Sequence, residues 1–371
     1  MQEMIFNDTK LVAVERASGE LRRGRVVLLE TNEGALLIQA LELTTTTTLH
    51  HMEQLIGCEA YIALSPERAA SLNIADQGRE ASLIKLSRHL RGDALHSLAD
   101  PHDDLAHPLM GPFYPAHVQL VKGHKAALKL CKISRLLPAA LVCDIVEAEQ
   151  ISQLKQEYNI LSVSEDVVLS YDHHDANSLE LIVQAKVPLA GAEETMMVAF
   201  RPISGGTEHF ALVVGDPKRS EAVLTRIHSE CFTGDLLGSL KCDCGEQLRG
   251  AIQYMHEQGG GVILYLAQEG RGIGLLNKMR AYALQDQGFD TVDANERLGF
   301  EDDERLFDPA AQMIQLMGFK SVRLLTNNPR KVAGLEACGV TVAERVKHAF
   351  PPNMHNVNYL KVKRDRSGHM L

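Results

Sequence analysis

The chain has 371 residues, enough for two or three domains, and its 45% hydrophobic and 23% charged content is that of a globular protein with a sizeable core. Its formal charge of −10 argues against general nucleic-acid binding, although a local basic pocket for phosphates stays open. No apolar run approaches the roughly 20 residues that span a bilayer, and the N-terminus lacks signal-peptide character. Seven cysteines without framework spacing favour a reducing compartment, so we expect a soluble cytoplasmic protein that binds neither membrane nor nucleic acid.

Local patterns in the first half predict two strands, GRVVLLE and ALLIQALEL, and two helices, HKAALKLCKISRLL and AEQISQLKQEY. The threonine run 44–48 is β-prone because threonine is β-branched, and we interpret it as a strand edge or a surface loop. A polar, turn-prone stretch, SYDHHDANSL, then separates two apolar-patterned regions. We place the domain boundary there, which predicts domains 1–175 and 176–371.

Strands and helices alternate more clearly in the second half. Leu248, Ile252 and Met255 at helical spacing predict a helix in GEQLRGAIQYMHEQ, which the glycines of GGG end. VILYLA is a short buried strand, EGRGIG a loop, and LLNKMRAYALQDQG an amphipathic helix that ends at Gly288. SVRLLT, NPRKVAGLEACG and VTVAERV predict strand, helix and strand. The chain as a whole therefore predicts two α/β domains, each a mixed sheet with flanking helices.

Three cysteines, Cys231, Cys242 and Cys244, lie within fourteen residues. Closely spaced thiolates are soft ligands that hold transition metals, most often zinc. Structural zinc sites usually have four protein ligands, whereas catalytic sites use three and leave one position for water. Free cysteine is also among the most buried residue types, so ordinary core cysteines are the alternative.

Three further segments carry chemically useful side chains. EGRGIG joins a strand to a helix, where its glycines and Arg271 suit an anion, although a plain turn is the alternative. In LLTNNPRKV, Thr326 and the asparagines are residues that commonly cap a helix. Lys331 near the positive helix terminus would bind a phosphate there, and the alternative is simple surface charge. GFEDDERLF alone reads as a charged helix start.

In combination these segments closely resemble GTP cyclohydrolase II, the enzyme family that opens riboflavin synthesis. The resemblance runs from about residue 180 to the end, on RIHSECFTGD, KCDCGEQL, QEGRGIGLLNKMRAYALQDQGFDTVDAN, LGFEDDERLF and RLLTNNPRKV in family order. It implies an α/β domain, usually paired into a homodimer. One departure is visible, because many members read HRQEGR where this chain has Leu266 and Ala267 before QEGR.

The resemblance assigns a role to each matching residue. It makes Cys231, Cys242 and Cys244 the ligands of one zinc ion per subunit. It implies GTP contacts at Arg226, Ile227, His228, Ser229, Glu230, Gln247, Glu269, Gly270, Arg271, Thr291, Thr326 and Lys331. Asp303 matches the proton acceptor, Arg305 the proposed nucleophile, and Tyr282 a tyrosine associated with completing formate release. For Arg305, electrostatic stabilisation is the competing role, because the very high pKa of a guanidinium makes nucleophilic attack difficult.

The family reaction is zinc-dependent hydrolysis of GTP to 2,5-diamino-6-ribosylamino-4(3H)-pyrimidinone 5′-phosphate, formate and pyrophosphate, with Mg²⁺ accompanying the triphosphate. Two alternatives stay open. A variant enzyme would stop at the formamidopyrimidine product without releasing formate, or a decayed enzyme would serve as a nucleotide-binding regulatory protein.

The first half looks like a diverged 3,4-dihydroxy-2-butanone 4-phosphate synthase domain. The traces are AVERASGELRRGRVVLLETNEGA, ALSPERAASL, PAHVQL and GHKAALKLCKISRLLPAALVCDI. The family's acidic loop DRENEGD appears as ETNEGA, which keeps Glu33 but has Ala35 in place of the last aspartate, and GHTEA appears as GHKAA with Lys125 and Ala126. Because that chemistry needs carboxylate-held metal and a base, we predict that this domain is inactive and serves folding, dimer contacts or regulation.

Overall fold

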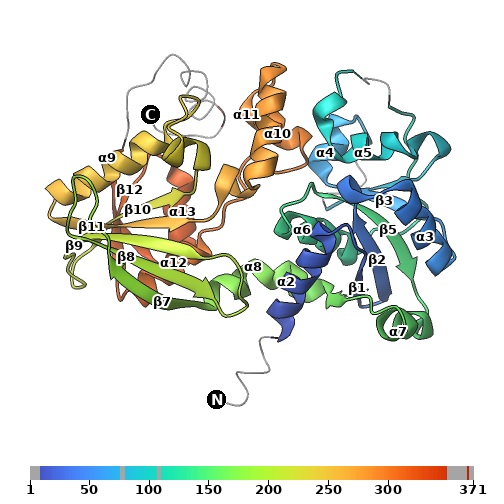
Figure 1. Ribbon diagram of the computed structural model, residues 1–371, viewed down its shortest axis with the longest axis horizontal. Helices are drawn as coiled ribbons and strands as arrows, with labels where there is room; N and C mark the ends of the chain where they lie inside the picture. Colours follow the sequence, from blue (N-terminus) through green and yellow to red (C-terminus); the bar gives the residue numbers. More distant parts are fainter. Residues whose placement is uncertain (1–8, 76–79, 107–109, 349–365, 367–371) are drawn as a thin grey trace. The chain divides into compact units, whose positions relative to one another are not determined.

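The computed structural model describes residues 9–75, 80–106, 110–348 and 366. The chain divides into two compact units (Figure 1). Unit 1 contains Met1–Tyr171 together with Leu276–Asp303, and unit 2 contains Asp172–Leu275 together with Glu304–Leu371. The segment Leu276–Asp303 therefore packs with the first half of the chain, although it lies far along the second half in sequence. The predicted boundary at residues 175/176 stays a prediction.

Unit 1 is built on a mixed six-stranded sheet of order β4-β3-β5-β2-β1-β6, in which only the β1–β6 pair is parallel (Figure 1). Its strands are β1 Val27–Thr31, β2 Gly34–Ala40, β3 Tyr61–Leu64, β4 Ser82–Lys85, β5 Ala139–Ile145 and β6 Ser162–Ser164. Its helices are α2 Thr9–Arg22, α3 Thr46–Ile56, α4 Pro66–Ser71, α5 Asp93–Ala99, α6 Lys122–Ile133 and α7 Ala148–Gln156, with short 3₁₀ turns η1 Leu41–Leu43, η2 Arg88–Leu90 and η3 Pro101–Asp103. Helices α10 Leu275–Asp286 and α11 Thr291–Arg297 complete it.

The main core of unit 1 lies between the sheet and helices α2 and α6. Alternate residues of a strand face opposite sides of a sheet. Val27 and Leu29 of β1 accordingly share one buried cluster with Leu21 of α2 and Leu130 of α6. The predicted strands GRVVLLE and ALLIQALEL and both predicted helices of the first half are confirmed as β1, β2, α6 and α7.

The interpretation of threonines 44–48 as a strand edge or loop is wrong. Thr45 caps helix α3, because its side chain accepts the backbone N–H of Thr48 while the Thr48 hydroxyl accepts the N–H of Thr45. Reciprocal capping satisfies two helix-end donors, which outweighs the β preference of threonine.

The polar stretch SYDHHDANSL is likewise helical rather than a turn. It forms the last part of α8 Glu165–Asn177. Glu165 and Asp166 in the first turn favour the helix through its dipole, and Tyr171 is buried in the core of unit 1. The division between the two units falls within this helix, after Tyr171.

Unit 2 is built on a seven-stranded mixed sheet of order β13-β12-β10-β11-β9-β8-β7. The β13, β12, β10 and β11 strands are parallel, and β9, β8 and β7 continue as an antiparallel meander. The strands are β7 Leu179–Lys186, β8 Thr195–Pro202, β9 His209–Gly215, β10 Val223–Ser229, β11 Gly260–Leu266, β12 Ser321–Leu325 and β13 Thr341–Val346. The helices are α9 Cys244–Glu257, α12 Asp308–Leu316 and α13 Pro329–Ala337, with the π-helical turn η4 Phe232–Leu236 and the 3₁₀ turn η5 Glu269–Gly272.

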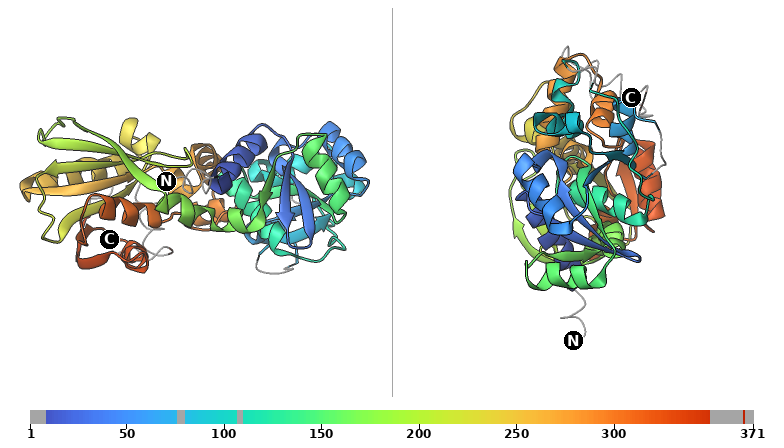
Figure 2. Two further views of the ribbon diagram at one scale, coloured as in Figure 1. Left: turned by 90° about the horizontal axis from the view of Figure 1, so that it is seen from below. Right: turned by 90° about the vertical axis from the view of Figure 1, so that its right-hand side faces the viewer.

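Helices cover both faces of this sheet (Figure 2). Val262 and Leu264 of β11 pack in one cluster with α12 and α13, whereas Ile263 between them packs with Ala251 and Met255 of α9. A strand buried on both faces reads as a continuous apolar run, as VILYLA does. The predicted fold class, two α/β domains that each contain a mixed sheet, is confirmed. Within the described part of the chain, no helix combines the length and apolar character that crossing a membrane requires.

Candidate active site

The three cysteines that sequence spacing singled out lie together in unit 2. The Sγ atoms of Cys231, Cys242 and Cys244 are all within 4.8 Å of one another, and those of Cys231 and Cys242 are 3.8 Å apart. Sulfur atoms that each lie about 2.3 Å from a tetrahedral zinc ion would be separated by about 3.8 Å. Among the described residues the cluster has three members, the number that catalytic zinc sites use.

Two glycines let the backbone pass close to these thiols. The Gly234 N–H points at Cys231 Sγ, 3.3 Å away, and a Cβ at Gly234 would lie 2.8 Å from Cys242 Sγ. A Cβ at Gly245 would lie 2.2 Å from the carbonyl oxygen of Gly234. The sequence FTGD…CDCGEQL thus forms a tight backbone cradle in which the three thiols converge. Converging soft ligands inside a glycine-lined cradle fit a bound zinc ion.

Asp235 holds this loop through three hydrogen bonds. Its Oδ2 accepts the Cys231 backbone N–H at 3.0 Å and the Tyr265 hydroxyl at 3.0 Å. The same carboxylate accepts from His228 Nε2 at 3.0 Å, and the Tyr265 ring stacks on the His228 ring. Burial lowers the pKa of His228 despite the neighbouring Asp235. The imidazole is therefore neutral near pH 7, with Nε2 protonated and Nδ1 as the acceptor.

The site residues gather where parallel strands end. β10 lies between β11 and β12 and runs parallel to both. Cys231 follows β10, Glu269 follows β11, and Thr326 follows β12. The carboxyl ends of neighbouring parallel strands meet at one edge of a sheet, which is where open α/β sheets bind ligands.

Several buried polar atoms at this edge lack a hydrogen-bond partner among the described residues. They are Arg226 Nε, His228 Nδ1, Ser229 Oγ and Gln268 Oε1. Buried polar atoms are nearly always hydrogen-bonded, so a group of them at one strand edge indicates an absent ligand. The atoms include donors and acceptors, as a purine base or a sugar phosphate would require.

Arg226 places a buried positive charge at this edge. Its side chain donates to Gln247 Oε1 at 2.5 Å and to the Leu325 carbonyl oxygen at 3.4 Å. Burial lowers its pKa to about 10, against the opposing effect of Cys244 and nearby acids. The guanidinium is thus still charged at neutral pH. The Gln247 side-chain amide in turn donates to the Asp243 carboxylate. The backbone carbonyl oxygen of Gln247 lies 2.9 Å from His348 Nε2.

The predicted glycine-rich loop is the tight turn η5. Gly270 and Arg271 both have left-handed backbone angles, with φ of 64° and 62°. For arginine this conformation costs of order 1–3 kcal/mol and is typical of functional sites. The buried carboxylate of Glu269 accepts the Phe232 N–H at 2.6 Å, which ties η5 to the cysteine loop. Of the two residues that depart from the family pattern, Leu266 is fully buried in the core, and the Ala267 N–H donates to His209 Nδ1 at 3.1 Å.

The predicted helix start in LLTNNPRKV is confirmed. Asn328 caps α13 by accepting the Arg330 N–H, and Pro329 occupies the first turn. Thr326 Oγ1 accepts the Asn328 N–H. Lys331 is not simple surface charge, because its side chain is buried and its Nζ donates to the Ile227 carbonyl oxygen at 2.7 Å. Glu230 is held by its N–H, which donates to the Leu266 carbonyl oxygen.

The structure divides the predicted site residues between the units. The thiols and most predicted GTP contacts belong to unit 2, as does Arg305. Tyr282, Thr291 and Asp303 belong to unit 1, within Leu276–Asp303. The charged stretch before α12 is not a helix start, because residues 301–306 are non-helical and α12 begins at Asp308.

The first-half segments that resemble the synthase family lie in unit 1, where their polar side chains contact other residues of the same unit. His124 Nε2 is 2.7 Å from the Tyr61 hydroxyl, which donates to Asp144 Oδ1 at 2.6 Å. Ala35 and Ala126, which replace acidic family residues, are both buried. Lys125 forms an ion pair with Glu80 at 2.8 Å. By the resemblance, buried alanines thus occupy two positions where the synthase family has carboxylates.

A thiol cluster beside a strained arginine–glycine turn, at the carboxyl edge of parallel strands, defines an α/β metalloenzyme. Comparisons with known proteins make the class specific. Residues 180–347 match the GTP cyclohydrolase II family. A GTP cyclohydrolase-2 of Azospirillum brasilense is 45% identical over 368 residues, which cover 99% of this chain and 96% of the relative. The chain belongs to the GTP cyclohydrolase II family.

Two further matches cover both halves of the chain. A riboflavin biosynthesis protein RibBA of Phocaeicola vulgatus is 33% identical, with 99% of each chain covered. The crystal structure of a two-domain 3,4-dihydroxy-2-butanone 4-phosphate synthase from A. baumannii is 15% identical, covers 91% of this chain and 99% of its own, and has a TM-score of 0.35.

Sequence reasoning missed several residues that support the site. Asp235 stands inside the quoted motif RIHSECFTGD, yet nothing in its spacing shows that its carboxylate holds Cys231, His228 and Tyr265 together. Tyr265 lies in a run that reads as a buried strand. His348 reaches Gln247 from 101 residues away in sequence. Only three-dimensional pairing shows these contacts.

Proposed function

We propose that this chain hydrolyses GTP to 2,5-diamino-6-ribosylamino-4(3H)-pyrimidinone 5′-phosphate, formate and pyrophosphate, the first step of riboflavin biosynthesis. The observation that carries the proposal is the group of unpartnered buried atoms, Arg226 Nε, His228 Nδ1 and Ser229 Oγ, beside the thiol cluster. A metal cluster next to donors and acceptors that have no partner among the described residues supports binding and hydrolysis of a polar ligand at one place.

The three thiolates Cys231, Cys242 and Cys244 hold zinc, which when bound lowers the pKa of a coordinated water and supplies a nucleophile near neutral pH. Asp235 keeps the Cys231 backbone in place. Neutral His228 offers Nδ1 as a hydrogen-bond acceptor beside the cluster. Glu269 fixes the cysteine loop to η5 through the Phe232 N–H. These groups orient the guanine for hydrolysis at C8, where each C–N bond that breaks consumes one water.

Pyrophosphate release needs compensation for the charge on the triphosphate. Arg226 carries a buried positive charge at the strand edge, Arg271 stands on the strained turn η5, and Lys331 lies at the start of α13. With Mg²⁺ on the triphosphate, these cations stabilise the developing negative charge. Arg305 acts in the same electrostatic way or as the nucleophile toward the α-phosphate. A covalent phosphoguanylyl adduct that is trapped in the native protein and lost in Arg305→Lys identifies attack, and its absence on quenching identifies the electrostatic role.

The proposal also includes a homodimer in the cytoplasm. The seven cysteines, which all lie among the described residues, form no disulfide with one another, which suits a reducing compartment. The three thiols of the cluster come from one chain, so each subunit of such a dimer would hold its own zinc ion.

The test measures formate and pyrophosphate released from GTP by the purified protein, with and without a zinc chelator. We expect both products, and loss of formate when zinc is removed. Pyrophosphate without formate identifies the variant that stops at the formamidopyrimidine. Binding of GTP with neither product would identify a nucleotide-binding regulatory protein and contradict the proposal.

A further inference from the structure

The carboxylate of Asp235 joins the thiol loop to the strand edge. Its Oδ2 accepts the backbone N–H of Cys231 and the hydroxyl of Tyr265. Its two oxygens lie 3.2 and 3.0 Å from His228 Nε2. These residues all belong to unit 2, and the side chains of Asp235 and His228 are only 8% and 3% exposed. A carboxylate that binds three donors with so little water around it fixes the position of each one.

The two rings beside this carboxylate come from neighbouring strands. His228 of β10 and Tyr265 of β11 are partners in the parallel register of the sheet (Figure 1). Their rings are stacked, with centroids 5.5 Å apart and an angle of 15° between the planes. Because the ring of His228 is stacked on one side and hydrogen-bonded at Nε2, its other nitrogen keeps one direction.

These contacts also decide which ring nitrogen of His228 carries the proton. An ionised carboxylate can only accept hydrogen bonds, so Nε2 is the donor to Asp235. The imidazole is neutral, since burial lowers the pKa of His228, and Nδ1 is therefore an acceptor. The carboxylate on one side of the ring thus sets the hydrogen-bonding character of the nitrogen on the other side.

His228 Nδ1 is buried and has no hydrogen-bond partner within the part of the chain that the structure describes. Arg226 lies two residues earlier on β10, so its side chain leaves the same face of the sheet. Its Nε is a buried donor that lacks a partner among the same residues. An unpartnered donor beside an unpartnered acceptor indicates a ligand that offers both an acceptor and a donor at this point.

The acceptor Nδ1 restricts which part of a nucleotide can lie against His228. The oxygens of an ionised phosphate only accept hydrogen bonds, so a phosphate at this point would bring two acceptors together. The N–H groups of guanine and the hydroxyl groups of ribose are donors, and either would satisfy Nδ1. A buried acceptor that is left without a donor is costly, which makes such an atom selective.

We propose that Asp235 is a positioning and specificity-determining residue, which fixes His228 in its Nε2–H tautomer so that Nδ1 accepts a hydrogen bond from the guanosine part of the nucleotide. This inference rests on the proposed function, and it adds which part of GTP lies against this point of β10. It also gives the Tyr265 ring a role, because the stacked ring holds the imidazole in the orientation that the contact requires.

The substitution Asp235→Asn reverses the tautomer with little change in shape. With its carboxamide oxygen in the place of Oδ2, asparagine still accepts the Cys231 N–H and the Tyr265 hydroxyl. Its amide nitrogen then donates to His228 Nε2, so that Nδ1 takes the proton and becomes a donor. The same exchange of carboxylate for carboxamide produces the wrong histidine tautomer in the Ser-His-Asp triad.

The measurements use the full-length, zinc-loaded protein. Isothermal titration calorimetry gives the Kd of guanosine and of inorganic tripolyphosphate. Nitrogen NMR of isotope-labelled histidine gives the tautomer, and the His228 signal is identified by its absence in His228→Gln. Zinc content, melting temperature, kcat and KM for GTP are recorded for each variant. Asp308→Asn is the matched control, because Asp308 lies 3.0 Å from His173 Nδ1 in the same unit.

We expect Asp235→Asn to raise the Kd of guanosine about 10- to 100-fold, because a donor then faces a donor. The Kd of tripolyphosphate should stay within about threefold of the wild type, and the zinc content should not change. NMR should show the proton on Nε2 in the wild type and on Nδ1 in Asp235→Asn. Asp308→Asn should keep every value within about twofold, as expected for an exposed pair.

Two substitutions of His228 separate the contact with the nucleotide from the contact with Asp235. The amide of His228→Asn lies where Nδ1 was and can offer an acceptor there, whereas the amide of His228→Gln lies where Nε2 was and keeps a donor for Asp235. We expect His228→Asn to bind guanosine more tightly than His228→Gln. A merely structural pair of His228 and Asp235 predicts the opposite order.

A guanosine Kd within about threefold of the wild type in Asp235→Asn overturns the inference, as does a wild type that binds no guanosine. So does an equal loss for tripolyphosphate, a loss that follows the zinc content or that Asp308→Asn shares, a wild-type proton on Nδ1, or the opposite order of the His228 variants. Calorimetry requires no turnover, so an inactive wild type with the expected binding pattern overturns the proposed function alone. An active wild type with an unimpaired Asp235→Asn variant overturns the inference alone.

Discussion

Gly234 shows how closely single residues shape the metal site. A Cβ there would lie 2.8 Å from Cys242 Sγ and 3.1 Å from Cys231 Sγ. We therefore predict that Gly234→Ala lowers zinc affinity about 10- to 100-fold, as changes next to a metal ligand typically do. Competition with a chromophoric chelator measures the affinity.

Gly238 provides the matched control for this substitution. It lies in the same loop with φ of +66°, and a Cβ added there would have no atom of the described residues within 4 Å. Asparagine tolerates this backbone conformation, so Gly238→Asn should keep its zinc affinity. Equal affinities in Gly234→Ala and the wild type would show that the cradle does not constrain the thiols.

His348 makes the stability of unit 2 depend on pH. Burial and the nearby Arg226 lower its pKa to about 4, whereas an unfolded histidine titrates near about 6.5. The unfolded chain thus takes up the proton first as the pH falls. Stability decreases below about pH 6.5, and the loss levels off near about pH 4. At about pH 5 the expected loss from this group is about 2 kcal/mol.

The measurement compares urea unfolding at about pH 7.5 and pH 5 in the wild type and His348→Gln. The variant should lose about 2 kcal/mol less between the two pH values, because its amide does not titrate. Protonation of the thiolates affects both proteins alike and cancels in the comparison. The same loss in both proteins would exclude His348 as the titrating group.

At the scale of elements, β11 and β12 are predictable from their apolar runs, whereas β10 before the cysteines and the partner of α10 are not. Only the structure shows that β10 pairs in parallel with β11 and β12, which places Cys231, Glu269 and Thr326 at one edge of the sheet. The helical pattern of LLNKMRAYALQDQG predicts a helix but says nothing about which unit it packs against. That choice depends on Glu42 and on Asp100, which is 180 residues away from Arg280 in the chain.

Two local predictions failed for a related reason. Thr45 caps α3 through reciprocal hydrogen bonds with Thr48, which a β-propensity scale does not record. The stretch after Ser170 has turn-like composition, yet burial of Tyr171 in the core of unit 1 favours helix α8. Tertiary contacts and capping override composition in both cases.

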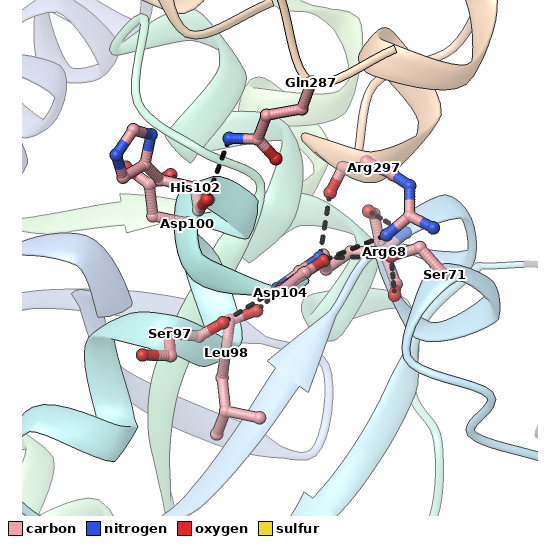
Figure 3. A network of polar contacts seen from close by, with 10 residues as sticks. Arg68, Ser71, Ser97, Leu98, Asp100, His102, Asp104, Gln287 and Arg297 are labelled. Carbon is pink, nitrogen blue, oxygen red and sulfur yellow. Dashed lines mark hydrogen bonds and ion pairs between the residues drawn. The ribbon is translucent and has the colours of Figure 1, made fainter. Parts of the chain in front are cut away.

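Removing one partner of the buried ion pair between Arg68 and Asp104 should destabilise unit 1 strongly (Figure 3). Their side chains are 1% and 8% exposed, and Arg68→Met leaves the Asp104 carboxylate without its bidentate partner. Breaking one side of a buried pair typically costs about 3–5 kcal/mol. We predict that Arg68→Met lowers the free energy of unfolding of unit 1 by this amount, as measured by chemical denaturation. Arg91→Met, which removes an exposed pair, should cost less than about 1 kcal/mol, and similar losses in the two variants would contradict the account.

At the scale of the whole molecule, the first half should have no synthase activity of its own. Ala35 and Ala126 are buried where the synthase family has carboxylates, and His124 is hydrogen-bonded to Tyr61. Metal-dependent enolisation needs carboxylate ligands and a base, and by the resemblance two of those carboxylates are replaced in this chain. Purified protein should therefore form no butanone phosphate from ribulose 5-phosphate above a metal-free control. Formation of that product would show a working second site.

The central claim is that Cys231, Cys242 and Cys244 hold the zinc on which formate release from GTP depends. The most direct measurement is zinc content together with formate per enzyme in the full-length wild type, Cys242→Ser and Cys338→Ser. Cys338 is a free, half-buried cysteine in the same unit but outside the cluster, which makes it the matched control. We predict about one zinc per chain and formate release in the wild type and Cys338→Ser, and neither in Cys242→Ser. Full zinc content and full activity in Cys242→Ser would contradict the account.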